Sequence, residues 1–355
     1  MERYNRRKRM VRIMTIINVC LLIAVGFMWY LQRPLPSPET WIAPGHIVKI
    51  DDFINAEPIS KVKNISLKTN LHMTYVREVE VTTRWNRFAL NLNGYELRNT
   101  NSHFSSSDTV TDFTKNDLNI LGKKLVPFMK HDIIKAAMVY HKIEWEEKIS
   151  RPIVIHHPEK FQTGVPLQVG DEIIELNGEP IESTDDIYFF LKSFHIGDTV
   201  TVKVQRKGNI IRIPIEIKEM DSSGRATLGV YLKHQFTFDG LNDDDVIQLD
   251  RTYIGESGGF ILTLGLIQKL EPSVDLSKGR IIAGTGGITR GGDIKPIGNL
   301  DLKVLTAVNE NADVFFYPKF QEAQIEEVRK AFSIGDIELI GVRNISEAIK
   351  YLTET

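Results

Sequence analysis

The sequence contains a single cysteine, Cys20, so no intramolecular disulfide can stabilise any part of the chain. It also has little net charge, because 44 Lys and Arg against 46 Asp and Glu give −2 at pH 7. No basic surface is indicated beyond the N-terminal tail, which excludes nucleic acid as a partner. All nine histidines lie at or before His234, so the chain beyond that point lacks the usual general base.

Two further absences exclude cofactors. Residues 284–292 are rich in glycine but lack the Gly-Lys-Ser/Thr ending with which a P-loop holds phosphate and magnesium, so no nucleotide is expected. His156 and His157 are adjacent, and adjacent residues of a strand point to opposite faces of the sheet. We therefore expect neither a metal nor any other cofactor.

The N-terminus predicts a membrane anchor. Residues 1–12 form a basic tail with six Lys and Arg, and residues 13–31 contain no charge over a length that can cross a bilayer. Basic residues beside a span stay in the cytoplasm, so the C-terminal domains are expected outside, with Trp29 and Tyr30 at the outer interface. A signal peptide is the alternative, but its apolar core is shorter and residues 32–36 offer no small-residue cleavage site. The absence of disulfides suits the outer face of a Gram-positive bacterium.

The segments that follow are predicted to be a linker and a spacer. Four prolines make residues 32–45 a stiff tether without helix. Residues 46–120 are expected to form an extracytoplasmic β-rich region that acts as a spacer or cap sheet, with partial alternation of polarity from Leu71 to Val81. No chemistry is assigned to this stretch.

Residues 121–220 are predicted to be a recognition domain with a leading helix, since apolar residues recur at helical spacing between Thr114 and Tyr140. Gly170-Asp171 and Asn177-Gly178 form turns around a short strand, followed by a helix at 184–193 and a strand at 199–206. These residues resemble the core motif of a PDZ domain over about 143–218. The resemblance implies binding of extended peptides by strand addition.

Residues 228–355 alternate glycine-rich turns, strands and helices in an α+β pattern. Ser257 lies among glycines directly before the apolar helix 260–270, where free backbone N–H groups can form an oxyanion hole. A serine needs a base, and lysine can serve if burial lowers its pKa. Lys303 lies at the edge of the inner stripe of a helix predicted at 301–311, and Thr285 offers a hydroxyl to orient its amine.

In order and approximate spacing, Gly255-x-Ser257-x-Gly259, Thr285-Gly286 and Pro296-Ile-Gly-x-Leu-x-x-Lys303 resemble the proteolytic domain of Lon-type Ser-Lys endopeptidases. The whole chain resembles the membrane-anchored PDZ-Lon proteases of Gram-positive bacteria. This resemblance implies that Ser257 is the nucleophile, Lys303 the general base and Thr285 a supporting residue. It implies ATP-independent hydrolysis of peptide bonds in accessible segments, with peptide or protein substrates and the lipid bilayer as partners. Whether the chain forms homo-oligomers stays open.

One departure from the family affects the expected activity. The family usually has proline before the nucleophile and alanine after it, whereas this chain has Glu256 and Gly258. A carboxylate at Glu256 could pair with Lys303 and hold it charged. The alternative function is therefore a catalytically weak or inactive receptor that binds a membrane or secreted partner. The predicted architecture is multidomain: a transmembrane helix, a β-rich spacer, a PDZ domain containing strands and helices, and an α+β proteolytic domain.

Overall fold

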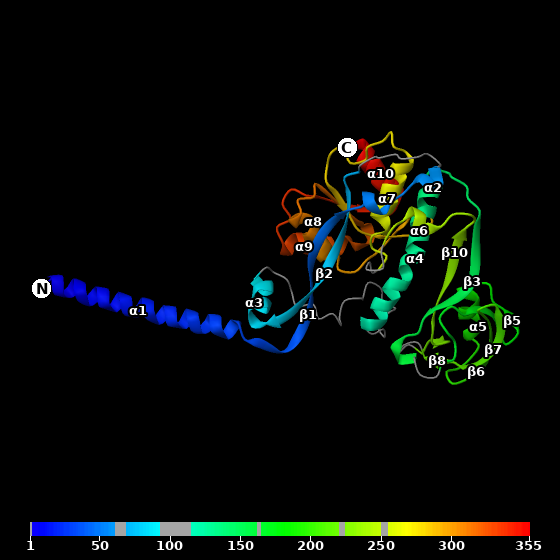
Figure 1. Ribbon diagram of the computed structural model, residues 1–355, viewed down its shortest axis with the longest axis horizontal. Helices are drawn as coiled ribbons and strands as arrows, with labels where there is room; N and C mark the ends of the chain where they lie inside the picture. Colours follow the sequence, from blue (N-terminus) through cyan, green and yellow to red (C-terminus); the bar gives the residue numbers. More distant parts are fainter. Residues whose placement is uncertain (1, 61–68, 93–114, 162–164, 220–223, 250–254) are drawn as a thin grey trace. The chain divides into compact units, whose positions relative to one another are not determined.

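The computed structural model describes residues 2–60, 69–92, 115–161, 165–219, 224–249 and 255–355 (Figure 1). The chain divides into two compact units. The first comprises Met1–Ala43 and Arg77–Ser102, and the second comprises Pro44–Val76 and His103–Thr355. Strands β1 (Pro34–Lys49) and β2 (Leu71–Thr83) contribute residues to both units.

The first unit contains a long helix, α1 (Glu2–Leu31), and a short one, α3 (Arg84–Leu92). Within α1, Arg9–Leu31 is long and apolar enough to cross a membrane, and its most apolar 18-residue window has no residue buried inside the protein. By length and composition the stretch fits a membrane anchor or a signal sequence.

The proline-rich segment is a strand rather than an irregular tether. Pro34–Lys49 forms β1, which is the end strand in the order of its sheet. Proline has no N–H to donate to a neighbouring strand, so it is tolerated in an edge strand. The expectation that this segment lacks helix agrees with the structure, but its residues belong to a sheet.

The main sheet of the second unit has the order β1-β2-β11-β14-β15. The last four strands run parallel to one another: β2, β11 (Ile282–Gly284), β14 (Val314–Pro318) and β15 (Glu338–Val342). The expected spacer differs from this arrangement, because Leu71, His72 and Met73 of β2 pair with β11 in the middle of the C-terminal sheet. Of the residues predicted as spacer, 61–68 and 93–114 lie outside the described part of the chain.

Alternate residues along the sheet belong to different hydrophobic clusters, so both faces are covered. Val314 and Phe316 pack in one cluster with residues of α7 and α10, whereas Phe315 and Tyr317 pack in another with residues of α8 and α9. The bounds of these helices are α7 (Gly259–Leu270), α8 (Leu300–Asn309), α9 (Glu322–Ala331) and α10 (Ile345–Glu354). The predicted α+β pattern is therefore an α/β arrangement, as parallel strands with helical crossovers require.

Helix α4 (Lys115–Tyr140) was predicted to lead into the recognition domain, and here that prediction is wrong. Its apolar stripe, which includes Met129, Ile133 and Ala137, is buried in the same cluster as Phe260 and Leu264 of α7. The apolar spacing forms a helix as predicted. Its apolar stripe packs against the apolar helix α7 rather than against the recognition domain.

The residues predicted as a PDZ domain contribute five strands to a six-stranded sheet with the path β10-β3-β4-β6-β7 and β5 beside β4 (green in Figure 1). The sixth strand, β10, comes from the start of the segment predicted as the proteolytic domain and pairs with β3. Helix α5 (Thr184–Leu191) begins with a capping box at Ser183 and buries Ile187 and Leu191 in this domain's own core. The strands are β3 (Glu147–His156), β4 (Glu172–Leu176), β5 (Glu179–Pro180), β6 (Thr199–Arg206), β7 (Asn209–Glu216) and β10 (Tyr231–Phe238). The predicted strands 172–176 and 199–206 are confirmed.

Short elements complete the described chain. They are η1 (Asp51–Phe53), α2 (Glu57–Ser60), η2 (Glu159–Phe161), β8 (Lys218–Glu219), β9 (Ala226–Thr227), α6 (Asp243–Val246), β12 (Gly287–Ile288), β13 (Ile294–Lys295) and η3 (Lys319–Gln321). Strands β12 and β13 form an antiparallel pair directly after β11.

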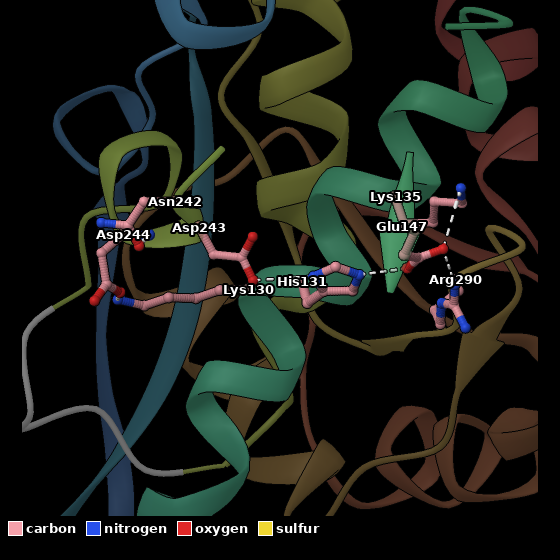
Figure 2. Close-up of polar contacts among 8 residues, drawn as sticks. All are labelled: Lys130, His131, Lys135, Glu147, Asn242, Asp243, Asp244 and Arg290. Carbon is pink, nitrogen blue, oxygen red and sulfur yellow. Dashed lines mark hydrogen bonds and ion pairs between the residues drawn. The ribbon is translucent and has the colours of Figure 1, made fainter. Parts of the chain in front are cut away.

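A buried ion-pair cluster centred on His131 joins four of these elements (Figure 2). His131 of α4 is 3 % exposed; its Nε2 lies 2.5 Å from Glu147 Oε1 on β3, and its Nδ1 lies 3.1 Å from Asp243 Oδ2 on α6. Arg290, from the β12–β13 turn, also donates to Glu147. Lys135 Nζ lies 3.3 Å from Glu147 Oε2. The cluster thus holds α4, β3, α6 and that turn together.

Protonation of His131 controls the strength of this cluster. Burial lowers the pKa of His131, but the hydrogen bonds with Asp243 and Glu147 outweigh it and raise the pKa above 6.5. Both ring nitrogens face carboxylates, and only the imidazolium can donate from both. For Glu147, burial raises the pKa, but His131, Arg290 and Lys135 together lower it below 4.5.

We predict that His131→Gln destabilises the fold by about 2 kcal/mol at pH 6 and by less at pH 9. The raised pKa of His131 gives a stabilisation that is complete below pH 6.5 and is lost as pH rises through the folded-state pKa. The lowered pKa of Glu147 gives a second stabilisation of the fold, which is complete above pH 4.5 and is lost as pH falls through the folded-state pKa. Thermal melts of the full chain in detergent between pH 2 and 9 measure both limbs.

The matched control is His195→Gln, because the His195 side chain is 95 % exposed. This control should melt like the unmodified chain at every pH. A melting difference for His131→Gln that stays constant from pH 6 to 9 would contradict the assignment of a charged His131.

Candidate active site

Ser257 lies in a tight turn two residues before the first residue of α7. Gly255 begins this turn with φ of +89°, a conformation that favours glycine. The side chain of Ser257 is half-buried, and its hydroxyl has no hydrogen bond with any described residue. The backbone N–H groups of Ser257 and Gly258 likewise donate to no acceptor in the described part of the chain. The turn therefore presents a hydroxyl beside two backbone N–H groups that have no acceptor among the described residues.

Close packing explains the glycine that follows. A Cβ on Gly259 would lie 2.9 Å from Ile288 Cγ2 and 3.3 Å from the Ile288 nitrogen, so α7 begins directly against β12. This contact is continued by the Phe260 N–H, which donates to Gly286 O at 3.0 Å. The serine turn is thus fixed against the chain that follows β11.

Thr285 connects the serine turn to Lys303. It is fully buried directly after β11, and its Oγ1 donates to Ser257 O at 3.1 Å. The Gly286 N–H donates to the same carbonyl at 2.8 Å. Lys303 Nζ in turn donates to Thr285 Oγ1 at 3.2 Å. The three residues named from the sequence are therefore brought together, with Thr285 between the other two.

Lys303 lies in the first half of α8, and its side chain is 5 % exposed. Burial lowers the pKa of Lys303 from 10.5 to about 7, and burial is the single cause, with no carboxylate acting against it. An amine normally needs a paired acid when it is buried, because desolvation disfavours the charged form. Lys303 instead has a neutral threonine, so a large fraction is the free amine near pH 7.

Glu256 does not pair with Lys303 in the structure. Its Oε1 lies 3.4 Å from Lys295 Nζ on β13 and 3.5 Å from Lys233 Nζ on β10. Asp132 of α4 adjoins this group, and burial raises the pKa of Asp132 while both lysines act to lower it. The hypothesis that Glu256 holds Lys303 charged is therefore not supported by the geometry. These partners come from distant parts of the sequence, so no local pattern indicates them.

The histidines considered from the sequence have other partners. His234 of β10 approaches Ser150 O with Nδ1 at 2.8 Å, and its Nε2 accepts from the Thr184 N–H at 3.3 Å. It therefore joins β10 to the start of α5. His156 and His157 lie at the end of β3, and the described residues contain no group of three or more His, Cys, Asp or Glu placed to hold a metal.

The glycine turns of the recognition domain have structural roles. Asp171 is fully buried, and its two oxygens accept from Arg206 Nε and a terminal nitrogen, each at 2.7 Å. Asn177, with φ of 49°, accepts from the Thr201 N–H at 2.7 Å through Oδ1, and Gly178 follows with φ of 91°. These turns fix β4 against β6.

Strand β10 is the end strand of this sheet, and α5 contacts it. In the described part of the chain, β10 pairs only with β3, which leaves its other edge without a strand partner. An edge beside a helix is the arrangement to which an extended peptide adds as a further strand.

Comparisons with known proteins support this domain. Residues 147–217 match the family model described as PDZ domain, so this chain contains a PDZ domain. No curated protein matches the chain. Among solved structures, the chain is similar to the PDZ domain of an SdrC-like protein from Listeria monocytogenes, with 22 % identity over 23 % of this chain and 87 % of that one, at a TM-score of 0.22.

The chain is also similar to the PDZ domain of an SdrC-like protein from Listeria innocua, with 23 % identity over 24 % of this chain and 97 % of that one, at a TM-score of 0.23. The second domain of a Listeria protein, solved in solution, has 23 % identity over 24 % of this chain and 84 % of that one, at a TM-score of 0.22. At these identities the likeness concerns the fold alone. The PDZ domain found by the family model is consistent with a peptide-binding role.

Proposed function

We propose that this chain is a membrane-anchored, ATP-independent serine endopeptidase in which Ser257 is the nucleophile and Lys303 the general base. The observation that carries the proposal is the state of Lys303. Its amine is buried, its pKa is lowered to about 7, and its described partner at the site is the hydroxyl of Thr285. A lysine with this pKa can accept a proton at neutral pH.

In the first step, the free amine of Lys303 accepts the proton of the Ser257 hydroxyl as Oγ attacks the carbonyl carbon of the scissile peptide bond. The hydroxyl must come within hydrogen-bond distance of Nζ in the substrate complex, since such contacts often tighten only there. The N–H groups of Ser257 and Gly258 have no acceptor among the described residues, which suits them to stabilise the oxyanion. The protonated Lys303 then donates to the leaving amine.

The second step removes the acyl group from Ser257. Lys303, again a free amine, accepts a proton from a water molecule as its oxygen attacks the ester carbon. Lys303 then donates this proton to Ser257 Oγ as the C–Oγ bond breaks and the carboxylic acid product leaves. Thr285 acts by position in both steps: it accepts a hydrogen bond from Lys303 and donates one to the carbonyl of Ser257. It therefore orients the base relative to the nucleophile's own backbone.

Two further parts complete the proposed function. Residues Arg9–Leu31 of α1 anchor the chain in the membrane, with the basic tail in the cytoplasm. The PDZ domain binds an extended segment of a peptide or protein substrate along the free edge of β10 beside α5. Recruitment by main-chain hydrogen bonds gives affinity for accessible, unfolded segments, which suits an enzyme without a nucleotide-driven unfolding module.

We predict that Ser257→Ala and Lys303→Ala each reduce cleavage of an unstructured fluorogenic peptide by about 1,000-fold or more, with the double variant no worse than either. Nucleophile and base act as one unit, so their losses do not add. Thr285→Ala should cost about 100-fold at most, because it removes orientation rather than the proton acceptor. Initial rates and labelling by a serine-reactive probe measure these effects.

Exposed residues provide matched controls. Ser273→Ala, just beyond α7, and Lys330→Ala, on α9, should keep full activity. Unchanged turnover in Lys303→Ala would refute the Ser-Lys assignment. A chain that neither cleaves peptides nor reacts with the probe at Ser257 would support the receptor function instead.

The value of kcat/KM should rise with pH through a midpoint near 7, because Lys303 must lose its proton before it can act as a base. We predict that Glu256→Gln leaves this midpoint unchanged, since Glu256 pairs with Lys233 and Lys295. Full pH profiles of the unmodified chain and the variant test this directly. A midpoint that falls in Glu256→Gln would mean that the carboxylate acts on Lys303 after all.

The role of the PDZ domain can be separated from the chemistry by replacing residues 158–229 with a short Gly-Ser linker. His156 and Tyr231 are register partners in β3 and β10, so the linker can join these strands while Glu147 keeps its contacts with His131. We predict that cleavage of a small unstructured peptide stays within about threefold, whereas cleavage of a protein substrate falls at least about tenfold. An equal fall in both rates would show that the domain supports the site structurally.

A further inference from the structure

Helix α3 has an apolar stripe that the proposed chemistry does not use. Trp85, Phe88 and Ala89 follow one another at the spacing of a single helix face, whereas Arg87 lies on the opposite side. Trp85 is 45 % exposed, so the described part of the chain leaves a large share of its surface uncovered. A surface helix with this pattern needs a partner for its apolar face.

The stripe continues the apolar surface of α1. Phe88 contacts Phe27 edge to face, with ring centroids 6.1 Å apart, and Trp85 lies 6.0 Å from Phe88. Phe27 precedes the last residue of α1, Leu31, by four residues, which corresponds to about 6 Å along the helix axis. Phe88 therefore lies about one helical turn inside the end of the apolar stretch.

Cationic groups surround the same end of α1. The Arg33 guanidinium lies 4.0 Å from the centre of the Trp29 ring, and that of Arg84 lies 4.3 Å from the centre of the Tyr30 ring. Aromatic rings combined with arginines are typical of the membrane interface, where the rings lie among the acyl carbons and the guanidinium groups reach the lipid phosphates. Trp29 and Tyr30 are themselves exposed, so this surface is continuous with the uncovered stretch of α1.

We propose that α3 is an interfacial helix that lies in the headgroup region of the bilayer, with its stripe of Trp85, Phe88 and Ala89 toward the acyl chains. The occupant of the stripe is lipid rather than a protein partner, because the stripe begins on the span itself and is bordered by arginines. Such helices bury their apolar face about 5–10 Å below the headgroups, which agrees with the depth of Phe88. The inference rests on the proposed membrane anchor, and it gives the chain a second point of attachment.

Site-directed spin labelling of the full chain in phospholipid vesicles tests this. The unmodified chain carries one label site, Cys20 in the span, which reports on the anchor itself. In a Cys20→Ser background, Ala89→Cys places the label on the stripe and Arg87→Cys places it on the opposite side. Collision rates with apolar oxygen and with a water-soluble nickel chelate measure the depth of each label.

The oxygen-to-nickel ratio at position 89 should exceed that at position 87 by about threefold or more, as expected for a helix lying in the interface. Equal ratios at 87 and 89 with a deep label at Cys20 would refute the interfacial helix and leave the anchor intact. A label at 89 shielded from both reagents would mean that protein covers the stripe, which also refutes the proposal. A water-exposed label at Cys20 would overturn the anchor and this inference together. If Ala89→Cys does not fold, Trp85→Cys tests the same stripe.

Discussion

The candidate site depends on the burial of one amine without a countercharge. Lys303 lies inside the protein against Thr285, and burial alone lowers its pKa to about 7. An adjacent carboxylate would stabilise the charged form and keep the lysine protonated at neutral pH. The acid nearest to Ser257 in the sequence, Glu256, is directed to Lys233 and Lys295 instead. The neutral pair of Lys303 and Thr285 at the site is therefore separate from the charged group that Glu256 forms with the two lysines.

This separation is maintained by elements from distant parts of the chain. Strand β2 pairs in parallel with β11, directly before Thr285, and α4 packs against α7, directly after Ser257. Segments that precede the PDZ domain in the sequence thus form part of the core that holds the serine turn. Deleting them would remove support from the site, so they cannot be treated as a spacer.

In the His131 cluster, unlike at Lys303, the charged side chains are paired with groups of opposite charge. It satisfies Glu147 with His131, Arg290 and Lys135, and so fixes the first residue of β3 to the turn between β12 and β13. Strand β13 of the same hairpin carries Lys295, which pairs with Glu256. One hairpin therefore contacts both Glu147 at the start of β3 and Glu256 beside Ser257.

The sequence by itself determined the local elements and the candidate residues. The uncharged run 13–31, the glycine turns around β4, the apolar helix after Ser257 and the hydroxyl at Thr285 are all read from spacing and residue type, because local backbone preferences decide them. Tertiary structure alone decided the partners: that β2 joins the C-terminal sheet, that α4 buries its stripe on α7, and that Lys303 is desolvated while Glu256 pairs elsewhere. Burial and ion pairing depend on which surfaces meet, and residues far apart in the sequence meet only in the folded chain.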